Sequence, residues 1–342
     1  MKNNLIFTAL FATMLTLFSC SNDFELIDTY KDIPVVYAIV SKADTASYFR
    51  VERVFVDEKI GAPQIAQIPD SLYYDASVEV VFFKQGNANS FKLQRVDGNL
   101  EGYVREKGAY AQTPNILYKI KASTSKFVDN EVIRVVVRRK NGTILTEGST
   151  TVLPDMILNA PDVKKNNTLY FDSKTNFNVA FTSNTEAARL FDVRLVLNIE
   201  EQDPANPTQY LKKSLEWFLE RNVKPSVNAK FPLQLSVRTP GTEFYKFLAN
   251  NLVANGRKRI FKTIEVVVDA SGTEVANYIN ATSANTGITG TEVLPNYTNM
   301  TKGFGIVSSK GKLSVKPIFL DDKNNALDTL RFGQYTKKLL FQ

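Results

Sequence analysis

The sequence predicts a mainly β protein: an N-terminal immunoglobulin-like β-sandwich followed by a second antiparallel β domain with about two helices. Three observations predict this class. Apolar and polar residues alternate through many segments, which is the period of strands that bury one face. Short turn signals separate these segments, and helical periodicity is rare. The chain has 342 residues, 44% of them hydrophobic, which is enough for two cores of ordinary size.

The first predicted domain covers residues 33–153. Several short strands with turns between them and no convincing helix are typical of an immunoglobulin-like sandwich. Asn141-Gly142 predicts a tight hairpin, because this pair favours the turn that joins two antiparallel strands. The expected strands are rich in Val, Tyr and Phe or alternate in polarity, and they cover residues 33–41, 48–55, 77–84 and 132–140.

The second predicted domain covers residues 154–342 and begins between Pro154 and Pro161. Two helices are expected, near residues 242–255 and 272–282. The first has Asn255-Gly256 at its end, a common C-terminal signal, and the second follows a capping-box spacing. Residues 211–219 fit either a helix or a strand, and the sheet-like flanks favour a strand. Alternation predicts further strands at residues 177–181, 191–199 and 264–268.

Two absences narrow the chemistry. The chain has no histidine and a single cysteine, Cys20. Ser-His-Asp and Cys-His catalysis within the chain are therefore excluded, and so are the usual zinc sites. We expect no catalytic residues, no metal and no cofactor apart from a covalent lipid. The 42 Lys and Arg against 35 Asp and Glu leave a modest positive charge without long basic blocks, so nucleic acid is not an expected partner.

Residues 1–19 have the pattern of a secretory signal peptide. A short positive start is followed by an apolar run of about 13 residues, or about 20 Å as a helix, too short to cross a membrane. Leu17-Phe18-Ser19-Cys20 resembles the lipobox of bacterial lipoproteins. The resemblance implies that Cys20 becomes the N-terminus and carries diacylglycerol on its thiol and a further acyl chain, such as palmitate, on its amine. Two or three chains hold a protein firmly on a bilayer.

The tether that follows, residues 20–32, indicates where the anchor lies. Ser21, Asn22, Asp23, Phe24 and Glu25 resemble the acidic signal that sends lipoproteins of Bacteroidota to the outer face of the outer membrane. The resemblance implies a lipid-anchored protein exposed at the cell surface. An alternative is a polar tether on a lipoprotein that faces the periplasm.

Few groups of residues in the sequence could catalyse a reaction or bind a ligand. Glu200-Glu201, Glu216 with Glu220, and Asp321-Asp322 are the available carboxylate pairs, and the first and last are typical of turns. Gly303-Phe304-Gly305 predicts a bend where two backbones approach closely. Tyr73-Tyr74 and Tyr297 lie in predicted loops, where tyrosines can stack on sugars or bind a partner.

Three short segments match the Asp-Ser/Thr-aliphatic pattern that Bacteroidota O-glycosylate on exported proteins. The candidate acceptors are Thr45, Ser71 and Thr329. We expect the intact mass of native protein to exceed that of the acylated chain if these sites are used.

Two stretches resemble a Bacteroidota family of outer-membrane surface lipoproteins of unknown function. The first is Tyr30-Lys31-Asp32-Ile33-Pro34-Val35-Val36-Tyr37, with Ala66-Gln67-Ile68-Pro69-Asp70-Ser71 downstream. The second comprises Asn285-Thr286-Gly287-Ile288, Pro295-Asn296-Tyr297-Thr298-Asn299 and Gly303-Phe304-Gly305-Ile306-Val307-Ser308-Ser309. The resemblance implies a strand-rich surface lipoprotein associated with outer-membrane β-barrel systems, and it supplies no catalytic residues.

These observations favour a non-enzymatic surface lipoprotein that acts as an accessory subunit of an outer-membrane β-barrel complex, in nutrient import, barrel assembly or protein export. The expected partners are a β-barrel protein and, through the acyl chains, the lipid bilayer. A surface glycan-binding lipoprotein is the first alternative, and a carboxylate-based hydrolase is the second.

Overall fold

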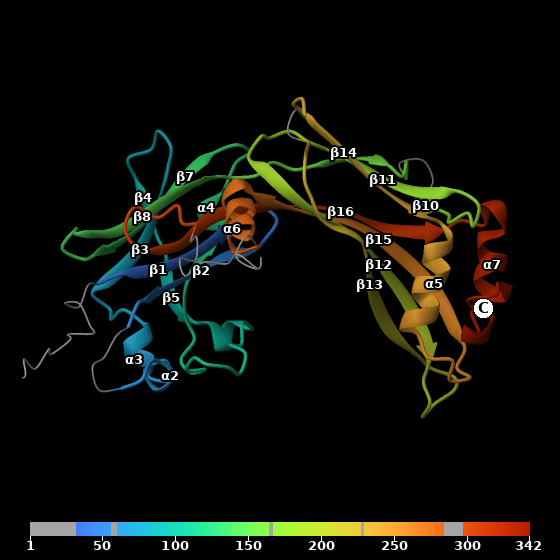
Figure 1. Ribbon diagram of the computed structural model, residues 1–342. Helices are drawn as coiled ribbons and strands as arrows, with labels where there is room; N and C mark the ends of the chain where they lie inside the picture. The colour runs from blue at the N-terminus through green and yellow to red at the C-terminus, as the bar shows by residue number, and fades with distance from the viewer. Residues whose placement is uncertain (1–31, 56–59, 164–166, 227–228, 284–296) are drawn as a thin grey trace, which may run out of the picture.

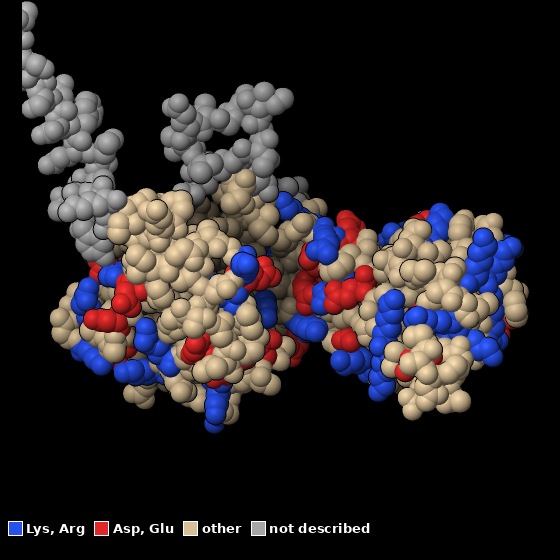
Figure 2. Space-filling model, turned by 90° about the horizontal axis from the view of Figure 1, so that it is seen from below, with Lys and Arg blue, Asp and Glu red and all other residues tan. Residues whose placement is uncertain are grey.

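The computed structural model describes residues 32–55, 60–163, 167–226, 229–283 and 297–342. Cys20 and residues 21–25 lie outside this part of the chain. The described residues form two lobes of β-structure, and one long strand, β16 (Phe304–Leu320), runs through both (Figure 1). Figure 2 shows the lobes as two bodies with charged side chains gathered on the narrow part between them.

The first lobe is a β-sandwich of two sheets. Its strands are β1 (Pro34–Val40), β2 (Ala46–Arg53), β3 (Val78–Lys84), β4 (Ser90–Lys92), β5 (Gln94–Asp97), β6 (Ile116–Lys121), β7 (Val132–Arg139) and β8 (Ile144–Thr151). One sheet, which we call the β1 sheet, has the order β5-β6-β2-β1-β16, and the other, the β3 sheet, has the order β4-β3-β7-β8. The predicted immunoglobulin-like sandwich is confirmed.

Strict alternation builds the core of this sandwich. Along β1, Val36, Ala38 and Val40 are fully buried while the residues between them face outward, and β2 repeats the pattern with Phe49 and Val51. The hairpin predicted at Asn141-Gly142 joins β7 to β8. Short helices occupy the connections: α2 (Ala62–Ile65), α3 (Pro69–Leu72), η1 (Gly98–Glu101) and α4 (Ala122–Ser125).

The second lobe packs a sheet of long strands against a smaller sheet. Its strands are β9 (Ile157–Ala160), β10 (Thr168–Leu169), β11 (Asn176–Ser183), β12 (Ala188–Gln202), β13 (Tyr210–Val223), β14 (Leu233–Pro240) and β15 (Arg259–Gly272). The long strands have the order β13-β12-β15-β16, and β10 also pairs with β16. Because they share β16 with the β1 sheet, the two form one nine-stranded sheet. The smaller sheet has the order β14-β11-β9. Residues 211–219 lie in β13, so the strand assignment is confirmed.

Aromatic rings dominate the core of the second lobe. Helix α5 (Thr242–Asn251) places Phe244 on Phe171 with ring centroids 4.0 Å apart, and the indole of Trp217 packs beside Phe247 at 5.6 Å. Such contacts add to the stabilisation that burial of the rings provides. The helices η3 (Lys323–Asn325), α7 (Ala326–Phe332) and η4 (Lys337–Leu339) close the far end of the lobe.

Strand β16 makes the two lobes continuous. Its first residues pair in parallel with β1, from Val35 opposite Phe304 to Val40 opposite Ser309. Its later residues pair antiparallel with β15. The chain first passes between the two cores at Val152 and Leu153, near the boundary expected at residue 154. The sequence assigned residues 154–342 to the second domain, whereas Met300 and Val307 belong to the first core.

The predicted close approach at Gly303 and Gly305 is confirmed. Both residues have positive φ angles, and a Cβ atom on Gly305 would lie 1.9 Å from the carbonyl oxygen of Val36. A Cβ on Gly303 would lie 2.2 Å from the carbonyl oxygen of Pro34. Glycine is therefore required where β16 enters the first lobe.

Helix α6 (Thr273–Ser283) begins at the predicted place and lies between the lobes, in contact with β12, β15 and β16. Helix α5 ends at Asn251, earlier than expected, because Leu252 adopts an extended conformation and turns into the core. The carbonyl of Val253 and the side chain of Asn255 then accept hydrogen bonds from Arg259. Among the described residues, no helix is long and apolar enough to span a bilayer.

Candidate functional site

Four tyrosines gather on the outer side of the β1 sheet, and we call this surface the tyrosine face: Tyr37, Tyr48, Tyr103 and Tyr110. The sequence places the first two there through alternation, because their neighbours along β1 and β2 fill the core. Tyr37 pairs across the strands with Arg50, and Tyr48 pairs with Lys119 on β6. Regular strand pairing therefore fixes the positions of these two tyrosines.

Tyr103 and Tyr110 come from the loop between η1 and β6, which its own hydrogen bonds hold in place. The buried Asn115 side chain donates to the carbonyl of Tyr103 at 2.7 Å. Asn99 accepts from the backbone N–H of Arg105 at 3.1 Å and donates to the carbonyl of Gln112 at 2.9 Å. A loop with this internal bonding presents its side chains in fixed positions.

The rings of the tyrosine face contact one another and their neighbours. The centroids of Tyr48 and Tyr103 lie 4.4 Å apart, and the guanidinium carbon of Arg105 lies 4.8 Å from the centroid of Tyr110. Tyr37 meets Tyr278 of α6 edge to face, with centroids 6.4 Å apart. Three separate parts of the chain thus converge on this surface.

The charges of the face are paired with one another. Glu52 accepts hydrogen bonds from Arg50 at 3.0 Å and from Arg105 at 2.9 Å. Glu101 accepts from the Tyr48 hydroxyl at 3.0 Å and forms an ion pair with Lys119. Hydrogen bonds from Lys119 and then Tyr48 lower the pKa of Glu101, which stays ionised at neutral pH.

Burial, followed by the hydrogen bond with Tyr278, raises the pKa of Tyr37 to about 12. Burial also raises the pKa of Tyr48. Both phenols are therefore neutral at physiological pH, and together with the paired charges they leave a surface of rings and hydroxyl groups with little net charge.

Apolar side chains project from η1 and from the loop that follows it. Leu100 is 88% exposed and Val104 is 73% exposed, beside Tyr103 at 52% and Tyr110 at 45%. Figure 2 is seen from the side on which this loop lies, and wide tan areas separate small groups of charged side chains on that lobe. Contiguous exposed apolar groups on a rigid loop are typical of interaction sites.

The candidate sites from the sequence are scattered. Thr45 is exposed just before β2, whereas Ser71 in α3 and Thr329 in α7 are half-buried. The Thr329 hydroxyl donates to the carbonyl of Asn325 at 2.8 Å. Thr45 is the most accessible of the three acceptors, and glycosylation at all of them stays a prediction. The lipidation site Cys20 and the export signal lie outside the described residues.

Tyr73 and Tyr74 lie in a loop, as expected, but the expectation that they could stack on sugars or bind a partner is wrong. Both are buried in the first core, because each hydroxyl finds a partner there. Arg105 donates to the Tyr73 hydroxyl at 2.8 Å, and the Tyr74 hydroxyl donates to Asp32 at 2.7 Å. Tyr297 is half-buried. In the loop between η1 and β6, Tyr103 and Tyr110 are exposed, and the sequence did not single them out.

The first carboxylate pair, Glu200 and Glu201, does not converge on one site. Glu200 and Glu201 are consecutive in β12, so their side chains point to opposite faces of the sheet. Glu200 binds Lys262 at 3.4 Å, and Glu201 binds Arg257 and Arg259. Within the described part of the chain, no group of three or more Asp, Glu, His or Cys residues is placed to hold a metal ion.

Comparison with known proteins gives little further information. No protein-family model and no curated protein matches this chain. A solved structure, the C-terminal globular domain of oligosaccharyltransferase from Pyrococcus abyssi, aligns with 70% of the chain at 8% identity and a TM-score of 0.24. The chain spans about half (48%) of the length of that structure. A likeness at this TM-score carries no argument about function.

Proposed function

We propose that the protein is a non-enzymatic, lipid-anchored protein of the cell surface that serves as an accessory subunit of an outer-membrane β-barrel complex, with the tyrosine face as its contact surface. The observation that carries this proposal is the exposed side chains of Leu100, in η1, and of Tyr103 and Val104, in the loop that follows and that its own hydrogen bonds fix. Exposure of apolar groups to water is unfavourable in free energy, and burial against a partner removes this cost.

The composition of the face supports a protein partner. Tyrosine and arginine are enriched in protein interfaces and among the residues that dominate their affinity. Tyr37, Tyr103 and Tyr110 supply rings, while Arg50 and Arg105 are already held by Glu52. Because the loop and the arginines are ordered before contact, binding incurs a small loss of conformational entropy.

The anchor supports a membrane partner. Cys20 precedes Asp32 by 12 residues, a reach of at most about 40 Å when fully extended. Asp32 is fixed to the first lobe, since its carboxylate accepts from Arg139 and Tyr74, each at 2.7 Å. A lipid on Cys20 would therefore keep the first lobe, which carries the tyrosine face, close to the bilayer and to a barrel embedded in it.

The variant with Leu100→Ser, Tyr103→Ser and Val104→Ser tests the proposal. Tagged wild-type protein purified from native membranes in mild detergent is expected to bring down a stoichiometric barrel protein. The variant is expected to recover at least about tenfold less of this barrel protein. The matched control is Val253→Ser with Phe332→Ser, two side chains on the second lobe that are each 73% exposed. A partner-free wild-type protein, or equal loss in the control, would contradict the proposal.

Surface location has its own test. Protease added to intact cells is expected to degrade the protein, while a periplasmic marker survives. Protection of the protein until the outer membrane is permeabilised would place it on the periplasmic side, and the surface part of the proposal would then fail.

Binding of a surface glycan is the second candidate function, and the exposure of the Tyr103 and Tyr110 rings favours it. Exposed rings stack on the apolar faces of sugars. This function predicts binding on a glycan array that Tyr103→Ser and Tyr110→Ser abolish, with no barrel protein in the pull-down.

A further inference from the structure

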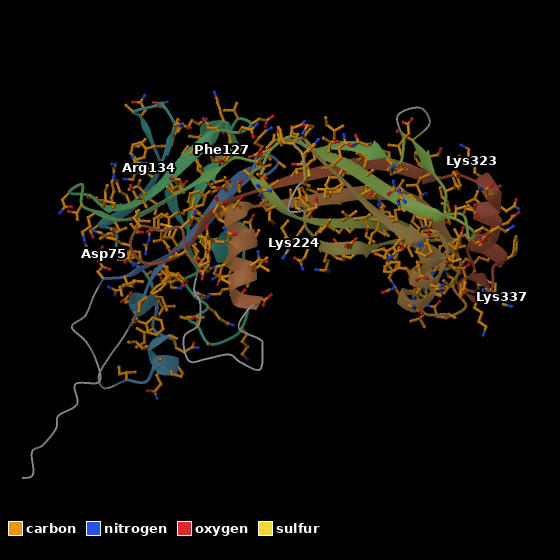
Figure 3. The ribbon with its side chains drawn as sticks, turned by 45° about the horizontal axis from the view of Figure 1, so that its top comes forward. Asp75, Phe127, Arg134, Lys224, Lys323 and Lys337 are labelled. Atoms are coloured by element: carbon orange, nitrogen blue, oxygen red, sulfur yellow. The ribbon has the colours of Figure 1, made fainter. Side chains whose placement is uncertain are left out.

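The first lobe contains a pocket of about 430 Å³ that the proposed function does not use. It lies where the ends of β2 and β7 meet α3 and the start of β5. Figure 3 labels Asp75, one of its lining residues, at the end of the first lobe that lies away from the second. The four tyrosines of the tyrosine face do not line it, so the pocket is a separate surface.

Three arginines line this pocket, and we call it the arginine pocket. Arg53 is the last residue of β2 and Arg139 is the last residue of β7, so these two come from the two different sheets of the sandwich. Arg95 lies in β5, at the edge of the β1 sheet. Three strands thus bring cationic side chains to one concave place, which attracts an anion.

Backbone carbonyl groups hold two of the three guanidinium groups in place. Arg53 donates from Nε to the carbonyl of Ser71 at 3.2 Å and from Nη2 to the carbonyl of Asp70 at 2.5 Å. Arg95 donates to the carbonyl of Tyr74 at 3.2 Å. These acceptors are neutral, and among the described residues neither arginine forms an ion pair. Because a guanidinium group has five N–H donors, each arginine keeps donors for a ligand.

Two of the carboxylates at the pocket have partners of their own. Asp32 accepts from Arg139 at 2.7 Å and neutralises that arginine. Asp75 accepts from the N–H and the hydroxyl of Ser77, at 2.9 and 2.5 Å. These hydrogen bonds lower the pKa of Asp75, and the charges of nearby arginines act in the same direction. Asp70 is exposed, so water and salt screen its charge.

Apolar groups complete the lining. Pro69 and Pro114 contribute to it together with Tyr73 and Tyr74, whose side chains are buried. The volume is within the range of pockets for small molecules, which begin at about 300 Å³. The pocket therefore has room for an organic group next to the anion.

We propose that the arginine pocket binds a phosphate monoester. The planar forks of Arg53 and Arg95 donate to the phosphate oxygens, and the organic group of the ester lies against Pro69 and Pro114. A phosphate monoester has three terminal oxygens, so it can accept from both guanidinium groups at once, and such charged hydrogen bonds are among the strong ones.

Two kinds of molecule carry this group, a membrane lipid and a soluble ester. The pocket lies beside the start of the described chain, because its Arg139 binds Asp32, which follows Cys20 by 12 residues. A lipid on Cys20 would therefore bring the pocket near the headgroups of the bilayer. The lipid source rests on the proposed anchor, whereas recognition of the phosphate group does not.

Glycerol 3-phosphate and glycerol form the matched pair of probes, since they differ only in the phosphate group. Calorimetric titration of the purified wild-type protein is expected to show that the phosphate ester binds at least about tenfold more tightly, the difference that hydrogen bonds between charged groups provide. Added salt should weaken this binding. The proposal would be overturned if neither compound bound, if both bound equally, or if acetate bound as tightly as the ester.

Dihexanoyl phosphatidic acid separates the two sources, because this short-chain lipid is soluble and carries the same phosphate monoester. Tighter binding than that of glycerol 3-phosphate assigns the pocket to a lipid headgroup, and equal or weaker binding assigns it to a soluble ester. Recovery of a barrel protein in the pull-down depends on neither result, so failure of the proposed function and failure of this proposal can be told apart.

Arg95→Gln tests one of the two phosphate-binding arginines. Arg95 is exposed, and glutamine removes its charge while keeping a side-chain N–H donor. The matched control is Arg238→Gln, an exposed arginine of β14 that lies outside the pocket and, within the described part of the chain, forms no ion pair. Affinity for glycerol 3-phosphate is expected to fall about tenfold in the first variant and to stay unchanged in the second. Equal affinities in the two variants would contradict the assignment.

Asp75→Asn changes the affinity in the opposite direction. Asparagine keeps an oxygen for the N–H of Ser77 and removes a negative charge from the lining. Affinity for glycerol 3-phosphate is expected to rise about two- to fivefold, the usual effect of one exposed charge. Damage to the fold would lower the affinity, so a rise has an electrostatic cause, and a fall would overturn the proposal.

Discussion

Replacement of Arg259 by methionine is expected to lower the free energy of unfolding of the second lobe by about 3 to 5 kcal/mol, the usual cost of removing one partner of a buried ion pair. Arg259 is fully buried, and its Nε donates to Glu201 at 2.8 Å. The same guanidinium donates to the carbonyls of Leu339 and Val253, each at 2.7 Å. Methionine fills similar space and leaves these acceptors without donors.

The backbone of Arg259 strengthens the case. Its N–H donates to the carbonyl of Leu340 at 3.0 Å, and its carbonyl accepts from Gln342 N–H at 2.9 Å. One residue thus holds the last turn of the chain against β15 through both its backbone and its side chain. We expect the Arg259→Met variant to expose residues 337–342 to carboxypeptidase before the rest of the lobe unfolds.

Arg257→Met is the matched control. Arg257 binds the other oxygen of the same carboxylate at 3.0 Å, but its side chain is 36% exposed. Pairs that exposed typically contribute less than about 1 kcal/mol, so this variant should stay close to wild type. Trp217, the only tryptophan in the chain, lies in the second core, and its fluorescence during denaturation reports this lobe. Equal shifts in the two variants would contradict the buried-pair argument.

The same pair gives stability a dependence on pH. Burial opposes ionisation of Glu201, but hydrogen bonds from Arg259 and Arg257 outweigh it and lower the pKa of this carboxyl below the ordinary value of 4.5. A group with a lowered pKa stabilises the fold above its unfolded pKa and loses this contribution as the pH falls. Arg259→Met should therefore reduce the loss of stability between pH 7 and pH 3 relative to wild type.

Alternating strands could be predicted from the sequence because the signal is local. In β12, Val193, Leu195 and Leu197 are fully buried and the residues between them are not, as their spacing predicts. Arg259 could not be predicted in this way. Three basic residues in a row, 257–259, suggest a solvated strand end, and the partner carboxylate lies 58 positions earlier in the chain. Only the pairing of β12 with β15 brings the two groups together.

The tyrosine face shows the same limit of prediction from sequence. Tyr37 and Tyr48 belong to predicted strands, and the period of those strands correctly implies an outward direction. Which loop tyrosines are exposed depends on distant partners: Tyr73 is buried because Arg105 reaches its hydroxyl, and Tyr103 is exposed because Asn115 fixes only its backbone. No local pattern separates these two cases.

The described parts of the two stretches that carry the family resemblance include paired strands. The first contributes β1, and the second contributes the start of β16, which pairs with β1. Asn299 holds this junction: its side chain donates to the carbonyls of Ser149 and Val307 and accepts from the N–H of Val307. These residues therefore have structural roles in closing the first lobe with a strand from the far end of the chain.

Replacement of Gly305 by alanine at this junction is expected to destabilise the first lobe by about 3 kcal/mol or more, since backbone strain and steric overlap each contribute about 1 to 3 kcal/mol. The φ angle of Gly305 is +100°, and the new Cβ would meet the carbonyl oxygen of Val36 at 1.9 Å. The backbone of β1 would have to move away, which breaks the parallel pairing. Amide exchange along β1 should rise with the loss of stability.

Two control variants separate the cost of the positive φ angle from the cost of steric overlap. Gly256→Ala shares a positive φ of 77° but meets no atom within 4 Å, so it should show only the backbone cost of about 1 kcal/mol. Gly108→Ala also has open space around it and should be neutral. The second core does not include the first residues of β16, so the Trp217 transition should shift less than amide exchange in β1. If Gly305→Ala destabilised the first lobe no more than Gly256→Ala destabilises the protein, steric overlap between β16 and β1 would not be the cause of the loss.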